Sequence, residues 1–340
     1  MRAHPAVAVL TLLPPLLAGC AGGSGEQQAT PALTKQQAAA VLQRYAQVKN
    51  QMQAAAARGV DGSLLATAET EPQLTMDLAA YRLYRTAGEK LRPLEYGQPT
   101  FYIPRLTGYP RWFAADTTSW VVVRKSSGGS AERTRPVRHA MLFVQRAPKA
   151  PWLLAADPLP SGGAPTSPLS AVALDKEGYA TAVRPDASGL AVSPDRLGEA
   201  HAAVLTRGAQ AAPHHRKVLA DGPATLRAHE GLSRATAQFR SLGITLTSTF
   251  APHDAPVYAL RTTDGGALVW YVLRQHESYV AGSPGKLRVG GDLTGLVSEK
   301  QARTRLDSTV LIQHLAQVPA GTGQAQITGM YRKAVHARGA

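Results

Sequence analysis

Leu268-Val269-Trp270-Tyr271-Val272-Leu273 predicts a β-strand whose two faces are both apolar. Side chains alternate between the two faces of a strand, and a strand that is apolar on both faces is covered on both sides. We expect helices from the same half of the chain to cover one face. The other half of the chain is the candidate cover for the second face.

Two predicted helices precede this strand, and further strands flank it. Ser193 caps the first helix, with Pro194 in its first turn, where proline is favoured. Gly243 ends the second helix. Asp-Gly within Thr263–Gly266 is typical of a tight hairpin turn. The predicted strands of this half are Thr245–Phe250, Val257–Thr262, Ala267–Arg274, Thr309–Gln317 and Gln326–Val335.

The first half of the chain repeats this order of helix, helix and strands. Thr34–Gln37 has the Thr-x-x-Gln pattern of a capping box and predicts the start of the first helix. An apolar stripe from Met76 to Leu91 predicts the second helix, which we expect Pro93 to stop. We expect Ala115–Thr118 to form a turn between two strands. The predicted strands are Thr100–Ile103, Arg111–Ala115, Trp120–Arg124, Ala140–Gln145 and Trp152–Ala156.

Helices followed by antiparallel strands indicate the α+β class. The proline-rich and glycine-rich segment 158–168 predicts a linker between two tandem domains, residues 33–157 and 169–340. Two helices followed by a curved sheet resemble the NTF2-like and cystatin-like folds. This resemblance implies a cone-shaped sheet around helices, and it transfers no catalytic residue.

The N-terminal segment predicts export and attachment to a membrane. Arg2 precedes the apolar run Ala6–Leu17, which has the length of a secretory signal and is too short to span a bilayer comfortably. Leu17-Ala18-Gly19-Cys20 resembles the lipobox of bacterial lipoproteins. That resemblance implies removal of the signal peptide 1–19 and a diacylglyceryl group on Cys20. An ordinary signal peptide with a chance cysteine, or an uncleaved anchor, is the alternative.

The segment 20–32 starts with a glycine-rich and serine-rich run and predicts a flexible tether. Cys20 is the only cysteine, so the exported part carries no disulfide. The whole chain is similar to uncharacterised actinobacterial lipoproteins with tandem domains of this kind. The expected location is the extracytoplasmic face of the cell membrane.

The formal net charge of +14 indicates an anionic partner or a solvated basic surface. Export argues against nucleic acid, and the sequence has no nucleic-acid-binding motif. Anionic lipid or an anionic wall polymer is the expected partner if the charge has a function. A basic surface common to the proteins of an arginine-rich organism is the alternative.

No catalytic residue, metal site or cofactor is predicted. His214 and His215 are adjacent and point apart, so they make a poor pair of metal ligands. Ser283-Pro284-Gly285-Lys286 matches Ser-x-x-Lys but favours a turn, and its companion motif is absent. Four aromatic residues in predicted strands are candidates to line a ligand pocket, or else to fill the core. These residues are Trp112, Trp120, Trp270 and Tyr271.

The function predicted from these features is a binding or scaffolding role at the cell envelope. The alternative is an exported enzyme, an isomerase or a hydrolase, with a pocket inside the cone as in SnoaL-like proteins. The two predictions differ in whether the cones are hollow and whether carboxylates point into them.

Overall fold

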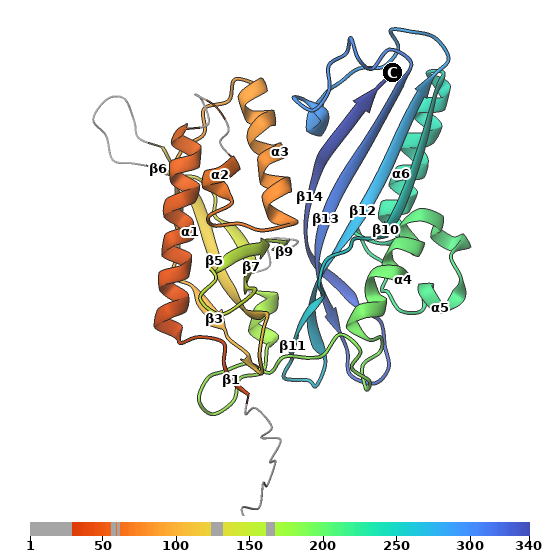
Figure 1. Cartoon of the computed structure of the whole chain (residues 1–340). Coiled ribbons are helices and arrows are strands. Elements are labelled where there is room, and N and C mark those ends of the chain that lie inside the picture. Colours follow the sequence, from red (N-terminus) through yellow and green to blue (C-terminus); the bar gives the residue numbers. More distant parts are fainter. Residues whose placement is uncertain (1–28, 56–58, 60–61, 124–131, 161–166) are drawn as a thin grey trace, which may run out of the picture.

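The computed structural model describes residues 29–55, 59, 62–123, 132–160 and 167–340. Within these ranges the chain is α+β, with a few helices and two large antiparallel sheets (Figure 1). Cys20 and residues 161–166 of the predicted linker lie outside the described residues. No helix along the described ranges is long and apolar enough to cross a membrane.

The first half of the described chain forms three helices and the first sheet. The helices are α1 (Lys35–Ala55), α2 (Gly62–Leu65) and α3 (Gln73–Thr86). The strands are β1 (Thr30–Pro31), β2 (Leu94–Tyr96), β3 (Thr100–Tyr102), β4 (Arg105–Leu106), β5 (Arg111–Val123), β6 (Glu132–Arg133), β7 (Val137–Gln145), β8 (Leu153–Ala156) and β9 (Leu159–Pro160). The sheet has the order β2-β5-β7-β8, with β3 and β6 also paired to β5. β1 pairs with β4, and β9 belongs to the second sheet.

The second half forms three further α-helices, three short 3₁₀ helices and the second sheet. The helices are η2 (Pro168–Ala171), α4 (Pro194–Arg207), η3 (Gly208–Gln210), α5 (Pro213–Arg216), α6 (Leu226–Ser241) and η4 (Gly291–Leu293). The strands are β10 (Ile244–Pro252), β11 (Tyr258–Arg261), β12 (Ala267–Ala281), β13 (Arg305–Val318) and β14 (Gln326–Gly339). The order is β10-β12-β13-β14-β9, with β11 also paired to β12.

The two sheets share the same order of strands along the chain. In the first sheet, β2 and β3 pair with one edge of the long strand β5, and β7 and β8 follow on its other side. In the second sheet, β10 and β11 pair with one edge of the long strand β12, and β13 and β14 follow on its other side. Outside this common order lie β6, which pairs with β5, and β9, which pairs with β14. Residues that follow the last strand of the first sheet thus join the edge of the second.

Side chains alternate between the two faces of each strand, so each sheet contributes to two hydrophobic cores. One face of the first sheet packs on α1, with Phe113 and Phe143 stacked at 5.1 Å between ring centroids. The opposite face contributes Trp112 and Leu142 to a core that the second sheet completes. The far face of the second sheet packs on α4. Figure 1 shows α1 and α4 on opposite sides of the pair of sheets.

The prediction for the strand Leu268–Leu273 is confirmed. Val269, Tyr271 and Leu273 lie in the core formed with α4, whereas Leu268 and Trp270 lie in the core between the two sheets. Both faces are therefore covered, one by a helix of the same half and one by the first half.

Two local predictions are confirmed by hydrogen bonds and strand pairing. The Thr34 N–H donates to Gln37 Oε1 at 2.8 Å, and the Gln37 N–H donates to Thr34 Oγ1 at 3.2 Å, as a capping box requires. The hairpin at Thr263–Gly266 joins β11 to β12, with Gly265 at φ +80°. A glycine is favoured at that backbone angle.

The predicted turn at Ala115–Thr118 is wrong, because β5 runs unbroken from Arg111 to Val123. The polar side chains that suggested a turn have partners on neighbouring elements. Asp116 accepts a hydrogen bond from Arg138 at 2.9 Å, and Thr117 donates to the Gly97 carbonyl at 3.0 Å. Polar residues can therefore occur within a central strand when residues distant in the sequence form hydrogen bonds with them.

The second helix is shorter than predicted. α3 ends at Thr86, and Leu91 lies beyond it. Gly88 has φ +69°, a backbone angle that favours the end of a helix. The stop therefore comes from Gly88, before Pro93 is reached.

Candidate functional site

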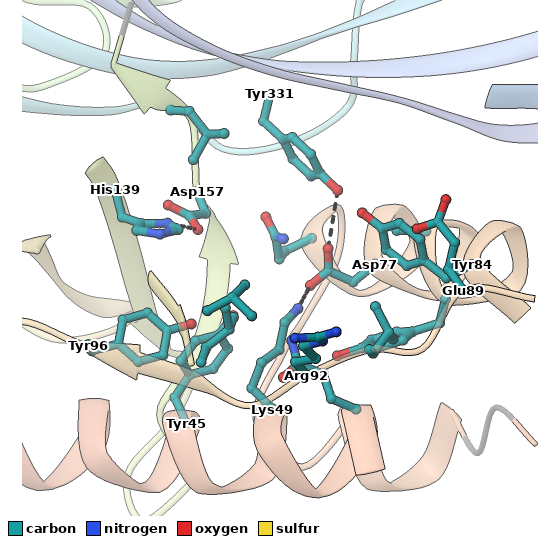
Figure 2. Close-up of a pocket in the computed structure, with 18 of the residues that line it drawn as sticks. Tyr45, Lys49, Asp77, Tyr84, Glu89, Arg92, Tyr96, His139, Asp157 and Tyr331 are labelled. Carbon is teal, nitrogen blue, oxygen red and sulfur yellow. Dashed lines mark hydrogen bonds and ion pairs between the residues drawn. The ribbon is translucent and has the colours of Figure 1, made fainter. Parts of the chain in front are cut away.

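A cavity of about 440 Å³ lies where α1, α3 and the first sheet meet β14 of the second sheet. Its lining is mainly polar and aromatic, and we call it the polar pocket (Figure 2). Ligand pockets typically measure about 300–1,000 Å³, so the size suits a small molecule. The tyrosines that line it are Tyr45, Tyr81, Tyr84, Tyr96 and Tyr331.

Helix α1 supplies one wall through residues spaced four apart. Tyr45, Lys49 and Gln53 all line the pocket. Side chains four positions apart lie on the same face of a helix. The capping box fixes where α1 starts. The apolar residues of α1 pack on the first sheet, so the edge of the helix that carries Tyr45, Lys49 and Gln53 is held beside the sheet.

Helix α3 supplies the facing wall with the same spacing, through Gln73, Asp77 and Tyr81. All three are buried. Lys49 connects the two helices, because its ammonium pairs with Asp77 and also lies 3.3 Å from Glu69 Oε1.

The pKa values of the two carboxyl groups in this cluster, Glu69 and Asp77, are shifted in opposite directions. Burial raises the pKa of Glu69, the Asp77 charge raises it further, and the net pKa lies well above the usual range. Burial also opposes ionisation of Asp77. The Lys49 charge and the hydrogen bonds that Asp77 accepts outweigh burial, so the pKa of Asp77 is lowered. Burial lowers the pKa of Lys49, yet Asp77 and Glu69 reverse this and raise it well above its ordinary value. The cluster is thus a buried Lys49 ammonium between two carboxyl groups, of which Asp77 is the more readily ionised.

Tyr331 brings the second sheet to the pocket. It projects from β14, and its hydroxyl donates to Asp77 Oδ1 at 3.3 Å (Figure 2). The pocket therefore depends on residues from both halves of the chain.

A relay of three buried side chains lies along the sheet wall. Ser119 Oγ is 2.7 Å from His139 Nε2, and His139 Nδ1 is 2.7 Å from Asp157 Oδ2. If Nδ1 donates to the carboxylate, Nε2 is left to accept from the serine hydroxyl. His139 and Asp157 line the pocket, whereas Ser119 is 4% exposed and does not line it. The Asp157 backbone N–H donates to Gln313 Oε1 on β13 at 2.7 Å.

Several buried polar atoms at the pocket have no hydrogen-bond partner among the described residues. Those on lining residues are Gln53 Oε1, Tyr81 OH and Asp157 Oδ1, and Glu69 Oε2 lies in the adjoining ion cluster. An unpaired buried polar atom costs about 1–3 kcal/mol. A ligand that pairs with these atoms would recover that cost.

Trp270 and Tyr271, two of the predicted pocket residues, line a different cavity of about 340 Å³. It opens between β7 and β8 of the first sheet and β12 of the second, and we call it the apolar pocket. Trp112 does not line it but packs on Tyr258, which does, at 5.3 Å between ring centroids. Trp112 and Trp270 both belong to the core between the sheets. Trp120 lies elsewhere, where its indole N–H donates to Glu95 at 3.0 Å.

The weaker sequence candidates do not converge on a site. His214 and His215 lie in the short helix α5 with their ring centroids 4.1 Å apart, so the expectation that they point apart is wrong. Across the residues that the structure describes, no group of three or more His, Cys, Asp or Glu side chains could hold a metal ion. Ser283–Lys286 lies in bends and turns after β12.

The polar pocket was not predicted from the sequence, because Tyr45, Lys49, Asp77, His139 and Asp157 belong to no recognisable motif. One signal was present: Tyr45, Lys49 and Gln53 place polar groups at helical spacing along the edge of an apolar stripe. The rest of the set comes from segments far apart in the chain.

The fold and site define an α+β protein with two packed antiparallel sheets and a polar pocket shared by both halves. The chain belongs to the family described as "Domain of unknown function (DUF8094)", whose profile matches residues 29–339. It is 26% identical over 330 residues to an "Uncharacterized lipoprotein" of Streptomyces avermitilis, covering 95% of this chain and 90% of that protein.

Two further relatives are named uncharacterized lipoproteins of Streptomyces coelicolor. One is 28% identical over 280 residues, covering 80% of this chain and 75% of the relative. The other is 29% identical over 354 residues, covering 96% of this chain and 92% of the relative. No solved structure gives a significant match.

Proposed function

We propose that this chain is a lipid-anchored lipoprotein on the extracytoplasmic face of the cell membrane that binds a small polar ligand in the polar pocket. The names of its relatives and the lipobox-like Leu17–Cys20 support a lipid anchor on Cys20. Removal of residues 1–19 would leave the segment 20–32 as a tether.

We further propose that the chain is a tandem repeat of one NTF2-like or cystatin-like unit. The units are residues 33–157 and 169–340, joined by the linker 158–168. The same strand order in the two sheets supports this proposal. The polar pocket would then lie inside the first unit, with Tyr331 of the second unit at its edge.

The unpaired buried atoms of the pocket carry the proposal, because they define what a ligand must supply. Gln53 Oε1 and Asp157 Oδ1 accept hydrogen bonds, so the ligand must present donors to both. Tyr81 OH can donate or accept. Hydroxyl and amino groups are the donors that satisfy such a set.

The remaining lining favours a ring compound that carries these donors. Tyr84 and Tyr96 contribute aromatic rings, and Lys90, Arg92 and Glu89 add charges of both signs. We infer that the ligand is a sugar or amino sugar of the size of one or two rings, the chemistry of wall carbohydrate.

The experiment is titration calorimetry with a panel of glucose, inositol, glucosamine and N-acetylglucosamine. We expect one of them to bind, and Asp157→Asn to weaken it roughly 10- to 100-fold, because the amide would place a donor where the ligand needs an acceptor. Tyr81→Phe should weaken it less. Asp254→Asn and Tyr109→Phe, at exposed positions, are the matched controls.

Thermal melting of each variant separates loss of binding from loss of fold. Equal affinity in wild type and Asp157→Asn would contradict the assignment of the pocket. Absence of binding by every member of the panel would reject the ligand class.

An exported enzyme is the second candidate, favoured by the Ser119–His139–Asp157 relay. Hydroxyl, imidazole and carboxyl are connected in the order that nucleophilic catalysis uses, at 2.7 Å each. Ser119 does not line the pocket, which is why binding stands ahead of catalysis.

A fluorophosphonate probe tests the enzyme directly, because it labels activated serines. Labelling of the wild type that Ser119→Ala and His139→Gln abolish would place hydrolysis ahead of binding. Ser233→Ala is the control, since Ser233 lies 3.4 Å from His229 Nε2 on an exposed helix face. No labelling of Ser119 would reject the hydrolase.

Attraction to anionic lipid or wall polymer is a further part of the proposal, supported by the net charge of +14. Lipid-free protein should bind anionic vesicles at low salt. Binding should weaken as the Debye length falls from about 30 Å at 0.01 M to about 8 Å at 0.15 M. No binding at low salt would leave only a solvated basic surface.

A further inference from the structure

The apolar pocket lies at the seam between the two sheets, apart from the polar pocket. Its first-half wall includes Leu142, Val144 and Ala156, and its second-half wall includes Trp270. These residues belong to the core between the sheets, so the cavity of about 340 Å³ extends that core toward solvent. A cavity with apolar walls binds apolar groups by removing them from water.

Two opposite charges line this cavity, and they do not neutralise each other. Glu71 Oε1 accepts a hydrogen bond from Thr75 at 2.8 Å. Arg146 is exposed and donates to the Thr70 hydroxyl at 2.9 Å, and no described carboxylate lies within ion-pair distance of it. A guanidinium has five N–H donors, so Arg146 retains most of its donors.

Tyr258 lines the same cavity as Arg146. Burial raises the pKa of Tyr258, and the Arg146 charge opposes the rise. A phenol and a guanidinium therefore both line the apolar pocket, and each can donate a hydrogen bond to an anion.

We propose that the apolar pocket binds a single-chain amphiphile, with its hydrocarbon chain between the two sheets and its anionic head on Arg146. A fatty acid is the simplest such ligand. The charge selects against a neutral lipid, because Arg146 has no internal carboxylate to pair with. This proposal does not depend on the ligand of the polar pocket.

The experiment uses the mature chain with Cys20→Ser and the fluorescent fatty acid cis-parinaric acid. We expect saturable binding at one site, with energy transfer from tryptophan, because Trp270 lines the cavity. Palmitate should displace the probe, and hexadecanol should compete roughly 10- to 100-fold less well, because it lacks the charge-assisted hydrogen bond. Lysophosphatidylglycerol, tested in the same way, distinguishes a membrane-derived lipid from a free fatty acid.

Two variants test the two ends of the site. Arg146→Gln should bring the acid and the alcohol to similar affinities, whereas Arg234→Gln on the exposed face of α6 should change nothing. Ala255→Trp at the rim should block both ligands while circular dichroism shows an intact fold. The proposal is overturned by the absence of saturable binding, by equal competition from palmitate and hexadecanol in the wild type, or by unchanged acid affinity in Arg146→Gln.

Discussion

The side-chain amide of Gln313 donates to Gln73 Oε1 across 2.9 Å, linking β13 of the second sheet to α3 of the first half. The same side chain accepts from the Asp157 backbone N–H at 2.7 Å. Gln313 is fully buried. One residue of the second half thus positions two residues that line the polar pocket.

Gln313→Leu should destabilise the protein, because it leaves the Gln73 carbonyl and the Asp157 N–H unpaired. At about 1–3 kcal/mol for each of the two buried groups, the free energy of unfolding should fall by about 2–6 kcal/mol in urea titrations. Gln36→Leu, at an exposed position of α1, is the control and should change it by less than about 0.5 kcal/mol. A loss no larger than that of the control would show that Gln313 is not a structural link.

Local features were predictable where neighbouring residues determine the outcome. The capping box at Thr34–Gln37 and the hairpin at Thr263–Gly266 depend on residues that are adjacent in sequence. The double burial of Leu268–Leu273 was predictable because an apolar strand has to be covered on each face.

The polar pocket was not predictable, because its contacts join distant segments. Gln73 and Gln313 are 240 residues apart, and Asp77 and Tyr331 are 254 residues apart. The error at Ala115–Thr118 has the same cause, since the partner of Asp116 is Arg138 on another strand. Side-chain polarity alone does not distinguish a turn from a strand whose polar groups are paired.

Lipidation of Cys20 is expected from the sequence Leu17-Ala18-Gly19-Cys20. An alkynyl fatty acid fed to cells should label the wild type and not Cys20→Ser. Two acyl chains anchor a protein stably whereas one does not, so Cys20→Ser should also leave the membrane fraction. Equal labelling of both proteins would contradict the prediction.

The Lys49–Asp77 pair should show strong coupling in a double-mutant cycle. Lys49→Met leaves a buried carboxylate unpaired and should cost about 3–5 kcal/mol of unfolding free energy. Adding Asp77→Asn should recover part of this loss, because the carboxylate that has lost its ion-pair partner is then replaced by a neutral amide. Additive effects in urea titrations would show that the two side chains do not interact.

Stability against acid also has an identifiable source in Asp77. The pKa of Asp77 is lowered in the folded state, so its contribution is present above its unfolded pKa and is lost as pH falls through the folded value. Asp77→Asn should therefore flatten the pH dependence of the unfolding free energy below about pH 4. An unchanged slope in that range would contradict the assignment.

His314→Phe should stabilise the protein, and more at pH 5 than at pH 7. His314 is 1% exposed between Tyr271 and His201, and neither ring nitrogen has a partner among the described residues. Burial lowers the pKa of His314 well below 6.5 and that of His201 to about 4. As pH falls, these histidines are therefore protonated in the unfolded chain at a higher pH than in the folded protein, and the free energy of unfolding decreases from about pH 6.5 toward pH 4. Urea titrations at both pH values should show the gain, whereas exposed His336→Phe should show none; a destabilised His314→Phe would reject the prediction.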